Sequence, residues 1–199
     1  MRTSNRNYEL ILTAAEGLFE RYGYDKTSVE DIAAGIGKSK TAVYYYFPGK
    51  QEILQSVLEK EFSTIIEEFR SCTSGEITRD QIFGYLSTRM EMFRKAKVYR
   101  QFLQIHYLCD NTEMVKMLEA VRRPFNEMEH RYFADFCKAC KRNGVFGDRM
   151  DADSFADMLI VLLRGYELQF LNSENYPLLE QTYCSALHFL IYREQNGQI

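Results

Sequence analysis

Residues 37–50 read GKSKTAVYYYFPGK, a stretch with three lysines, no acidic residue and three consecutive tyrosines. The chain as a whole has a formal net charge of −3, so the positive charge here is a local feature. A local surplus of ammonium and hydroxyl groups is typical of a surface that contacts a polyanion such as DNA. Whether this stretch can reach a groove of DNA depends on the helices that the neighbouring segments form.

The segment before this stretch predicts two short helices joined by a tight turn. Thr27 and Glu30 have the spacing of a capping box, which predicts that the first of these helices starts at Thr27. Gly37 can take the left-handed backbone conformation that a tight turn requires, and Ser39 is a good cap for the helix that follows. Two short helices around a glycine-containing turn form a helix-turn-helix.

The rest of the chain also predicts helices. Apolar residues recur at helical spacing, and no long β-type alternation appears. We expect an all-α protein of about nine helices, with a three-helix helix-turn-helix domain at 1–49 and a larger helical domain at 50–199. Pro124 either kinks a helix or opens a new one. The two last helices are expected at about 152–172 and 176–193.

The composition narrows the class of protein further. An apolar content of 46% is enough for a packed core. No run reaches the roughly 18 apolar residues of a membrane span, and the first residues have no signal-peptide character. The five cysteines are scattered and odd in number, which favours free thiols in a reducing cytoplasm. We therefore expect a cytoplasmic protein with no membrane partner.

Several separated segments resemble the DNA-binding domain of TetR/AcrR-type transcriptional regulators. They are residues 27–33 (TSVEDIA), Gly37, Ser39 and residues 43–50 (VYYYFPGK), within a match of roughly residues 8–58. The resemblance implies a ligand pocket in the C-terminal helices and a dimeric four-helix bundle formed by the last two. The turn departs from the usual Ala-Gly-Val-Ser of the family.

In that turn Ile36 replaces a small residue and Lys38 replaces an apolar one. Ile36 could fill the space of the missing valine. Lys38 could lay its aliphatic stem on the core and direct its ammonium towards phosphate.

The short second helix of the motif would reach base edges with its N-terminal residues. Lysine can donate to guanine O6 and N7, and methyl groups can touch the thymine methyl. The expected base contacts are Lys40, Thr41, Ala42 and Tyr44. Hydroxyls, ammonium groups and helix N-termini suit phosphate oxygens without reading sequence. The expected phosphate contacts are Thr27, Lys38, Ser39, Tyr45 and Lys50. Tyr46 and Phe47 are expected to pack the helix in place.

The C-terminal half is rich in methionine and aromatic residues, which suit an adaptable apolar pocket as well as an ordinary core. The expected pocket residues are Phe83, Met90, Phe93, Phe102, His106, Tyr107, Met128, Tyr132 and Tyr166, with Arg122 and Glu167 as further polar handles. The expected dimer interface comprises Phe155, Met158, Leu162, Gly165, Tyr183, Leu187 and Leu190.

Two sequence features could indicate a metal or redox site. Cys137 and Cys140 form a lone Cys-x-x-Cys, and Glu127 and His130 form a single Glu-x-x-His. A structural zinc site has four ligands and a di-iron bundle needs two such motifs plus further carboxylates, so we expect no metal and no cofactor.

The leading hypothesis is a ligand-responsive regulator, a repressor that binds a near-palindromic double-stranded DNA operator as a homodimer. A small, largely apolar or aromatic effector would release it. No catalytic arrangement or phosphate-binding glycine loop is detectable, so we expect no enzyme. Two alternatives remain at this point: a metal- or thiol-dependent sensor or enzyme on a helical bundle, and a helical protein-interaction adaptor.

Overall fold

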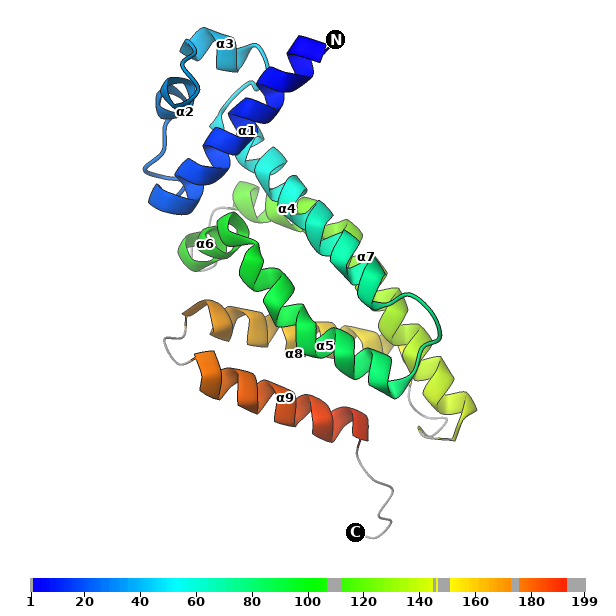
Figure 1. The fold of residues 1–199 in the computed structure, drawn as a ribbon. Coiled ribbons are helices and arrows are strands. Elements are labelled where there is room, and N and C mark those ends of the chain that lie inside the picture. Colours follow the sequence, from blue (N-terminus) through cyan, green and yellow to red (C-terminus); the bar gives the residue numbers. More distant parts are fainter. Residues whose placement is uncertain (1, 107–111, 145, 147–150, 173–175, 193–199) are drawn as a thin grey trace. The chain divides into compact units, whose positions relative to one another are not determined.

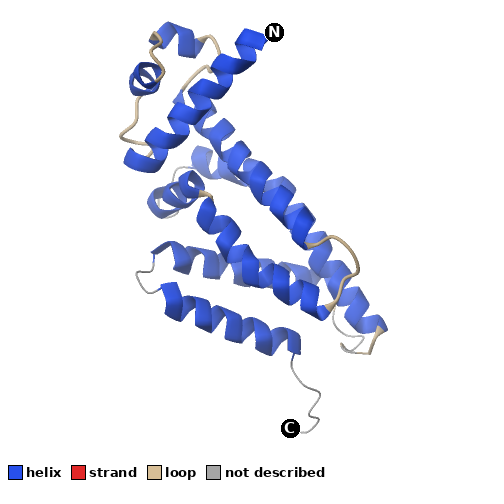
Figure 2. Cartoon of the chain, in the orientation of Figure 1, coloured by secondary structure: helices blue, strands red, loops and turns tan. Residues whose placement is uncertain are grey.

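The computed structural model describes residues 2–106, 112–144, 146, 151–172 and 176–192. Figure 1 follows the chain through its helices, and Figure 2 shows helices and loops with no strand among these residues. In chain order the helices are α1 (Arg2–Tyr22), α2 (Val29–Gly35), α3 (Lys40–Tyr44), α4 (Lys50–Cys72), α5 (Arg79–Lys95), α6 (Lys97–His106), α7 (Thr112–Arg142), α8 (Ala152–Asn172) and α9 (Tyr176–Tyr192).

The predicted all-α class and the number of helices are confirmed for the described residues. Pro124 lies inside α7, which runs as one helix from Thr112 to Arg142, so the proline does not open a new helix. None of the described helices is long and apolar enough to cross a membrane.

The chain divides into two compact units. Unit 1 comprises residues 1–64 and 96–122, and unit 2 comprises residues 65–95 and 123–199. Helices α4 and α7 each begin in unit 1 and end in unit 2. The expected domain boundary between residues 49 and 50 is placed at the end of the helix-turn-helix motif, whereas these units are defined by compactness in space. The expected boundary therefore stays a prediction.

In unit 1, α1 packs against α2 and α6. Glu61 of α4 fixes the start of α6, because its carboxylate accepts the backbone N–H groups of Val98 (2.9 Å) and Tyr99 (2.8 Å). These N–H groups have no partner within a helix, so a carboxylate there stabilises the first turn. Burial raises the pKa of Glu61 to about 7 against the lowering effect of the Val98 N–H, and Glu16 and Glu20 raise it further.

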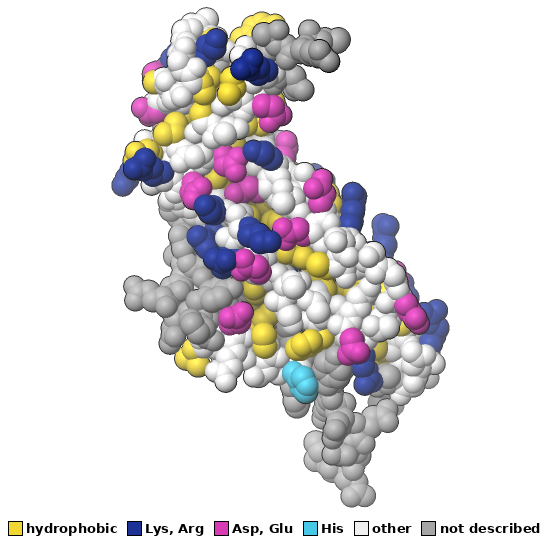
Figure 3. Space-filling model, in the orientation of Figure 1, with side chains coloured by type: hydrophobic (Ala, Val, Ile, Leu, Met, Phe, Trp, Pro, Cys, Tyr) yellow, Lys and Arg dark blue, Asp and Glu magenta, His cyan; other side chains and the backbone are white. Residues whose placement is uncertain are grey.

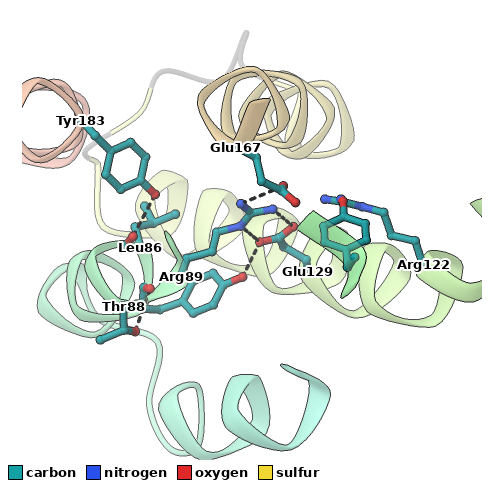
Figure 4. Close-up of polar contacts among 9 residues, drawn as sticks. Leu86, Thr88, Arg89, Arg122, Glu129, Glu167 and Tyr183 are labelled. Atoms are coloured by element: carbon teal, nitrogen blue, oxygen red, sulfur yellow. Dashed lines mark hydrogen bonds and ion pairs between the residues drawn. The ribbon is translucent and has the colours of Figure 1, made fainter. Parts of the chain in front are cut away.

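In unit 2, α5, α8 and α9 pack on one another around a buried charged cluster (Figure 4). Arg89 of α5 donates to Glu129 of α7 through Nε (2.6 Å) and Nη2 (3.2 Å), and it pairs with Glu167 of α8 at 3.4 Å. The Tyr85 hydroxyl also donates to Glu129. Burial by itself lowers the pKa of Arg89, but the carboxylates of Glu129 and Glu167 outweigh it and raise this pKa. The cluster thus joins three helices by charge.

We expect Arg89→Met to lower the free energy of unfolding by about 3–5 kcal/mol, because Glu129 would keep its burial and lose its cation. Chemical denaturation measures this loss. The matched control is Arg94→Met, which breaks the exposed pair with Glu91 and should cost less than about 1 kcal/mol. Equal losses in the two variants would contradict the structural role of the buried cluster.

Glu61 predicts a pH-dependent stability. Its pKa is about 7 in the folded chain and about 4.3 in an unfolded one, so the folded state binds this proton more tightly. The contribution of Glu61 is therefore fully present below about pH 4 and is lost as the pH rises through 7. Between pH 5 and 8, the free energy of unfolding of the wild type relative to Glu61→Gln should fall by about 2 kcal/mol.

Urea denaturation of both proteins at several pH values measures this difference. Glu67→Gln, at an exposed position of α4, is the control, and its difference from wild type should stay within about 0.5 kcal/mol across the range. A constant difference for Glu61→Gln would show that this carboxyl does not titrate between pH 5 and 8.

Candidate functional site

The start of α2 is held by a capping box. Ser28 is the N-cap, its side chain accepts the Asp31 N–H (3.1 Å), and the Asp31 carboxylate accepts the Ser28 N–H (2.9 Å). The predicted box of Thr27 and Glu30 is therefore wrong by one residue. Thr27 is only 2% exposed, and its hydroxyl donates to the Gly23 carbonyl at 2.8 Å. This burial removes the Thr27 hydroxyl from the expected phosphate contacts. The half-buried Ser28 hydroxyl donates to the Asp31 carboxylate at 2.6 Å.

The turn after α2 closes with two backbone hydrogen bonds. Gly37 N–H donates to Ala34 (3.0 Å) and Lys38 N–H donates to Ala33 (2.9 Å), the pattern of a Schellman motif. Gly37 has φ of +64°, which confirms the left-handed conformation predicted for it. Lys38 is exposed and makes no ion pair within the described part of the chain, so its ammonium is available to an external anion.

Helix α3 is anchored at both ends. Ser39 caps it by accepting the Ala42 N–H (3.3 Å), as predicted. Val43 and Phe47 are buried, and the Phe47 ring stacks on Tyr8 of α1 with centroids 4.8 Å apart. Asn7 of α1 donates to the Tyr46 hydroxyl (3.3 Å). Phe47 and Tyr46 therefore hold α3 against α1, as expected.

The other face of α3 is open to solvent. Lys40, Thr41 and Tyr44 are exposed, Ala42 is half-buried, and Tyr45 is 80% exposed. Three of the four residues expected to contact bases are thus accessible, and the contact of the set with DNA stays a prediction. Figure 3 shows basic and acidic side chains interspersed on the face it presents, which agrees with a local rather than a general affinity for nucleic acid.

Two lysines of this region already have partners within the protein. The Lys40 ammonium pairs with the Glu30 carboxylate and lies 5.5 Å from the centre of the Tyr44 ring. Lys50 donates to the Tyr24 carbonyl (2.8 Å) and lies 4.1 Å from the centre of the Tyr24 ring. The carbonyl and the ring explain why a lysine is tolerated at the start of α4, so its position does not by itself indicate an external anion.

A cavity of about 210 Å³ lies beside α3. Ile11, Ile36 and Ala42 supply apolar walls, and Lys38 and Tyr45 are among the polar residues that line it. Ile36, which departs from the family pattern, is therefore half-buried next to the expected phosphate contacts.

In unit 2 the residues expected in a ligand pocket form part of an aromatic interior. Met90, Phe93 and Tyr132 are buried, and Phe83, Met128 and Tyr166 are half-buried. The Phe93 and Phe125 ring centroids are 5.4 Å apart, and those of Tyr166 and Tyr183 are 5.1 Å apart. Phe102 is buried in unit 1, and Tyr107 and the His106 side chain lie outside the described residues. A ligand role for the set stays a prediction.

Sequence reasoning missed the charged cluster of Arg89, Glu129 and Tyr85, although it noted Glu167. The available signal was Arg89 itself, which falls on the buried face of α5 between Leu86 and Phe93. An arginine on an apolar stripe indicates a buried partner.

Of the residues expected in the dimer interface, Met158 (44%), Leu162 (43%) and Gly165 are exposed, and so is the neighbouring Val161 (69%). Their role in an interface stays a prediction. These residues share one face of α8 because they recur at helical spacing. Met158, Val161, Leu162 and Gly165 are referred to below as the α8 stripe.

Phe155 and Tyr183 correct the prediction, because both are buried within unit 2. Phe155 packs against Phe146, with ring centroids 5.3 Å apart, and the Tyr183 hydroxyl donates to the Leu86 carbonyl (2.8 Å). The side chains of Leu187 and Leu190 lie outside the described residues.

The lone Cys-x-x-Cys lies inside α7. Cys137 and Cys140 are buried free thiols, and burial raises the pKa of both. A raised pKa disfavours the thiolate that redox chemistry and metal binding require. His130 lies 3.3 Å from Asp157, and no group of three or more metal-ligating side chains occurs among the described residues.

A capped helix, a left-handed glycine turn and a second short helix with an exposed polar face define a helix-turn-helix DNA-binding protein. Residues 11–57 match the family described as bacterial regulatory proteins, tetR family. This segment of the chain is therefore similar to the DNA-binding domain of the TetR family of transcriptional regulators.

Relatives extend the similarity beyond the motif. The repressor BepR of Brucella suis is 23% identical over 83% of this chain and 81% of its own length. An HTH-type regulator from the lacX 3′ region of Lactococcus lactis is 28% identical over 68% of this chain and 66% of its own length. The regulator FadR of Bacillus subtilis, solved in complex with stearoyl-CoA, shares the fold with a TM-score of 0.72 and 18% identity, over 92% of this chain and 97% of its own.

We expect Ser28→Ala to lower the free energy of unfolding by about 1 kcal/mol, because α2 would lose its N-cap. Thermal and urea denaturation measure the loss. Ser63→Ala, at an exposed position within α4, is the control and should be neutral or slightly stabilising, since alanine is the better helix former. If Ser28→Ala were as harmless as Ser63→Ala, the capping box would not contribute to the fold.

Proposed function

We propose that the protein is a cytoplasmic, ligand-responsive transcriptional repressor that binds a near-palindromic operator as a homodimer. The observation that carries this proposal is the exposed face of α3, with Lys40, Thr41 and Tyr44 at the surface of a helix anchored by Val43 and Phe47. A short helix fixed on its buried side and polar on the other suits insertion into a major groove.

The surroundings of α3 provide groups for the DNA backbone. Lys38 and Tyr45 are exposed next to the cavity with apolar walls. An ammonium and a hydroxyl suit phosphate oxygens, which fix the register of the protein without reading sequence. Ser39 and Lys50 complete the proposed phosphate set from the ends of neighbouring helices.

Dimer formation is supported by the α8 stripe. Its apolar side chains project from one helix face, and a contiguous exposed apolar surface is typical of a protein interface. In a two-fold dimer the same stripe meets itself, and each subunit presents one α3 to one half-site. The near-palindromic operator follows from that symmetry.

Release by an effector is supported by the aromatic interior of unit 2 and by the solved complex of FadR with stearoyl-CoA. We infer a largely apolar or aromatic effector that occupies this interior. A ligand changes operator affinity only if it binds the DNA-competent and the released state unequally, so the effector must favour the released state.

The test is selection of duplex DNA from a random pool by the full chain. We expect a near-palindromic sequence to be enriched, and Lys40→Ala to weaken binding to it by about 1–3 kcal/mol with relaxed preference at one position per half-site. Lys38→Ala should weaken binding to all sequences evenly and reduce the salt slope by about 1 per subunit. Quantitative gel shifts at several salt concentrations measure both effects.

Lys60→Ala is the control. Lys60 is exposed, pairs with Glu16, and follows the helix-turn-helix in the sequence. It should leave preference unchanged. Failure of the wild type to enrich any sequence, or unaltered preference in Lys40→Ala, would contradict the proposal.

A further inference from the structure

The lysine expected to read bases is held by an acid on the same surface. Glu30 is the second residue of α2 and Lys40 is the first residue of α3, and their side chains form an ion pair across the turn. We propose that Glu30 is a positioning residue that sets the sequence specificity of α3 by restraining Lys40. This inference rests on the proposed DNA-binding function.

The backbones that carry the pair are fixed on both sides. The capping box of Ser28 and Asp31 orders the first turn of α2, and Ser39 caps α3 directly before Lys40. Glu30 and Lys40 can therefore meet without rearranging either helix. The Lys40 ammonium also lies 5.5 Å from the centre of the Tyr44 ring, so the carboxylate and the ring together hold it along the exposed face of α3.

Both members of the pair are charged and accessible. Their side chains are 57% and 46% exposed, for Glu30 and Lys40 respectively. The hydrogen bond from Lys40 lowers the pKa of the Glu30 carboxyl, and the same bond raises the pKa of the ammonium. The pair therefore persists at neutral pH, and solvent reaches it from the side on which DNA would bind.

An exposed pair biases the position of a side chain without locking it. Such pairs change populations by about two- to fivefold, and salt weakens them. An ammonium has three donors, so Lys40 can keep its bond to Glu30 and still donate to a guanine in the groove. Movement to a phosphate instead breaks the pair and brings phosphate close to the carboxylate. The restraint thus opposes non-specific contact more than base contact.

A carboxylate on a DNA-binding face also repels DNA directly, and this effect needs no Lys40. The two explanations differ in one respect. Direct repulsion acts whether or not residue 40 is a lysine, whereas restraint disappears with the lysine. A double-mutant cycle between Glu30 and Lys40 separates them.

The experiment uses the full chain, the duplex that the wild type selects from a random pool, and a scrambled duplex of equal length. If no duplex is selected, the proposed function and the role of Glu30 that rests on it are both overturned. With a selected duplex in hand, dissociation constants are measured for wild type, Glu30→Gln, Lys40→Ala and the double variant at several salt concentrations.

We expect Glu30→Gln to bind scrambled DNA about three- to fivefold more tightly while selected DNA changes by less than about twofold. The salt slope on scrambled DNA should steepen by about 1 per subunit, because Lys40 becomes free to displace a counterion. In the Lys40→Ala background, Glu30→Gln should leave the ratio of the two affinities unchanged. Glu30→Asp, which shortens the arm by one methylene, should give an intermediate ratio.

Glu67→Gln makes the same change of net charge at an exposed site of α4 in unit 2, and circular dichroism confirms that each variant is folded. The proposal is overturned if Glu30→Gln leaves the affinity ratio unchanged, if its effect is equally large without Lys40, or if Glu67→Gln has the same effect.

Discussion

The shortness of α3 is the constraint on which the helix-turn-helix depends. A helix from Lys40 to Tyr44 has little more than one turn and cannot persist on its own hydrogen bonds. Its conformation comes from its surroundings: Ser39 at one end, and Val43 and Phe47 buried beneath it. Helix α1 supplies the stacking ring of Tyr8, so even the first helix of the chain serves to present a five-residue surface.

Charged side chains have different roles in the two units. Unit 1 keeps its lysines at the surface and balances some of them locally, as Glu30 does for Lys40. Unit 2 places an arginine at the centre of its core, where Glu129 and Glu167 neutralise it and three helices become mutually dependent. A surface pair affects the position of one side chain, whereas a buried cluster couples the helices that supply its members, because breaking a buried pair costs several kcal/mol. An effector that entered the aromatic interior would meet helices coupled in this way.

The sequence predicted the helical class, the left-handed Gly37 and the Ser39 cap, because each depends on local chemistry. It could not separate the two registers of TSVED, since hydroxyls at 27 and 28 each stand three residues before an acid, and only the burial of Thr27 decides between them. Apolar spacing identified Phe155 and Tyr183 as helix-face residues without indicating which neighbour covers them. Arg89 finds its partners 40 and 78 residues away, a separation no local pattern encodes.

In the dimer proposed above, the α8 stripe would have a consequence for gene control. A dimer held by this apolar helix face would dissociate, by mass action, as the regulator becomes scarce. At low abundance the number of dimers would then grow with the square of the number of chains. Promoter occupancy would respond to regulator dosage more steeply than in proportion, and halving the copy number would cost more than half of the occupancy. The strength of that one helix face would thus set the cellular concentration at which repression begins.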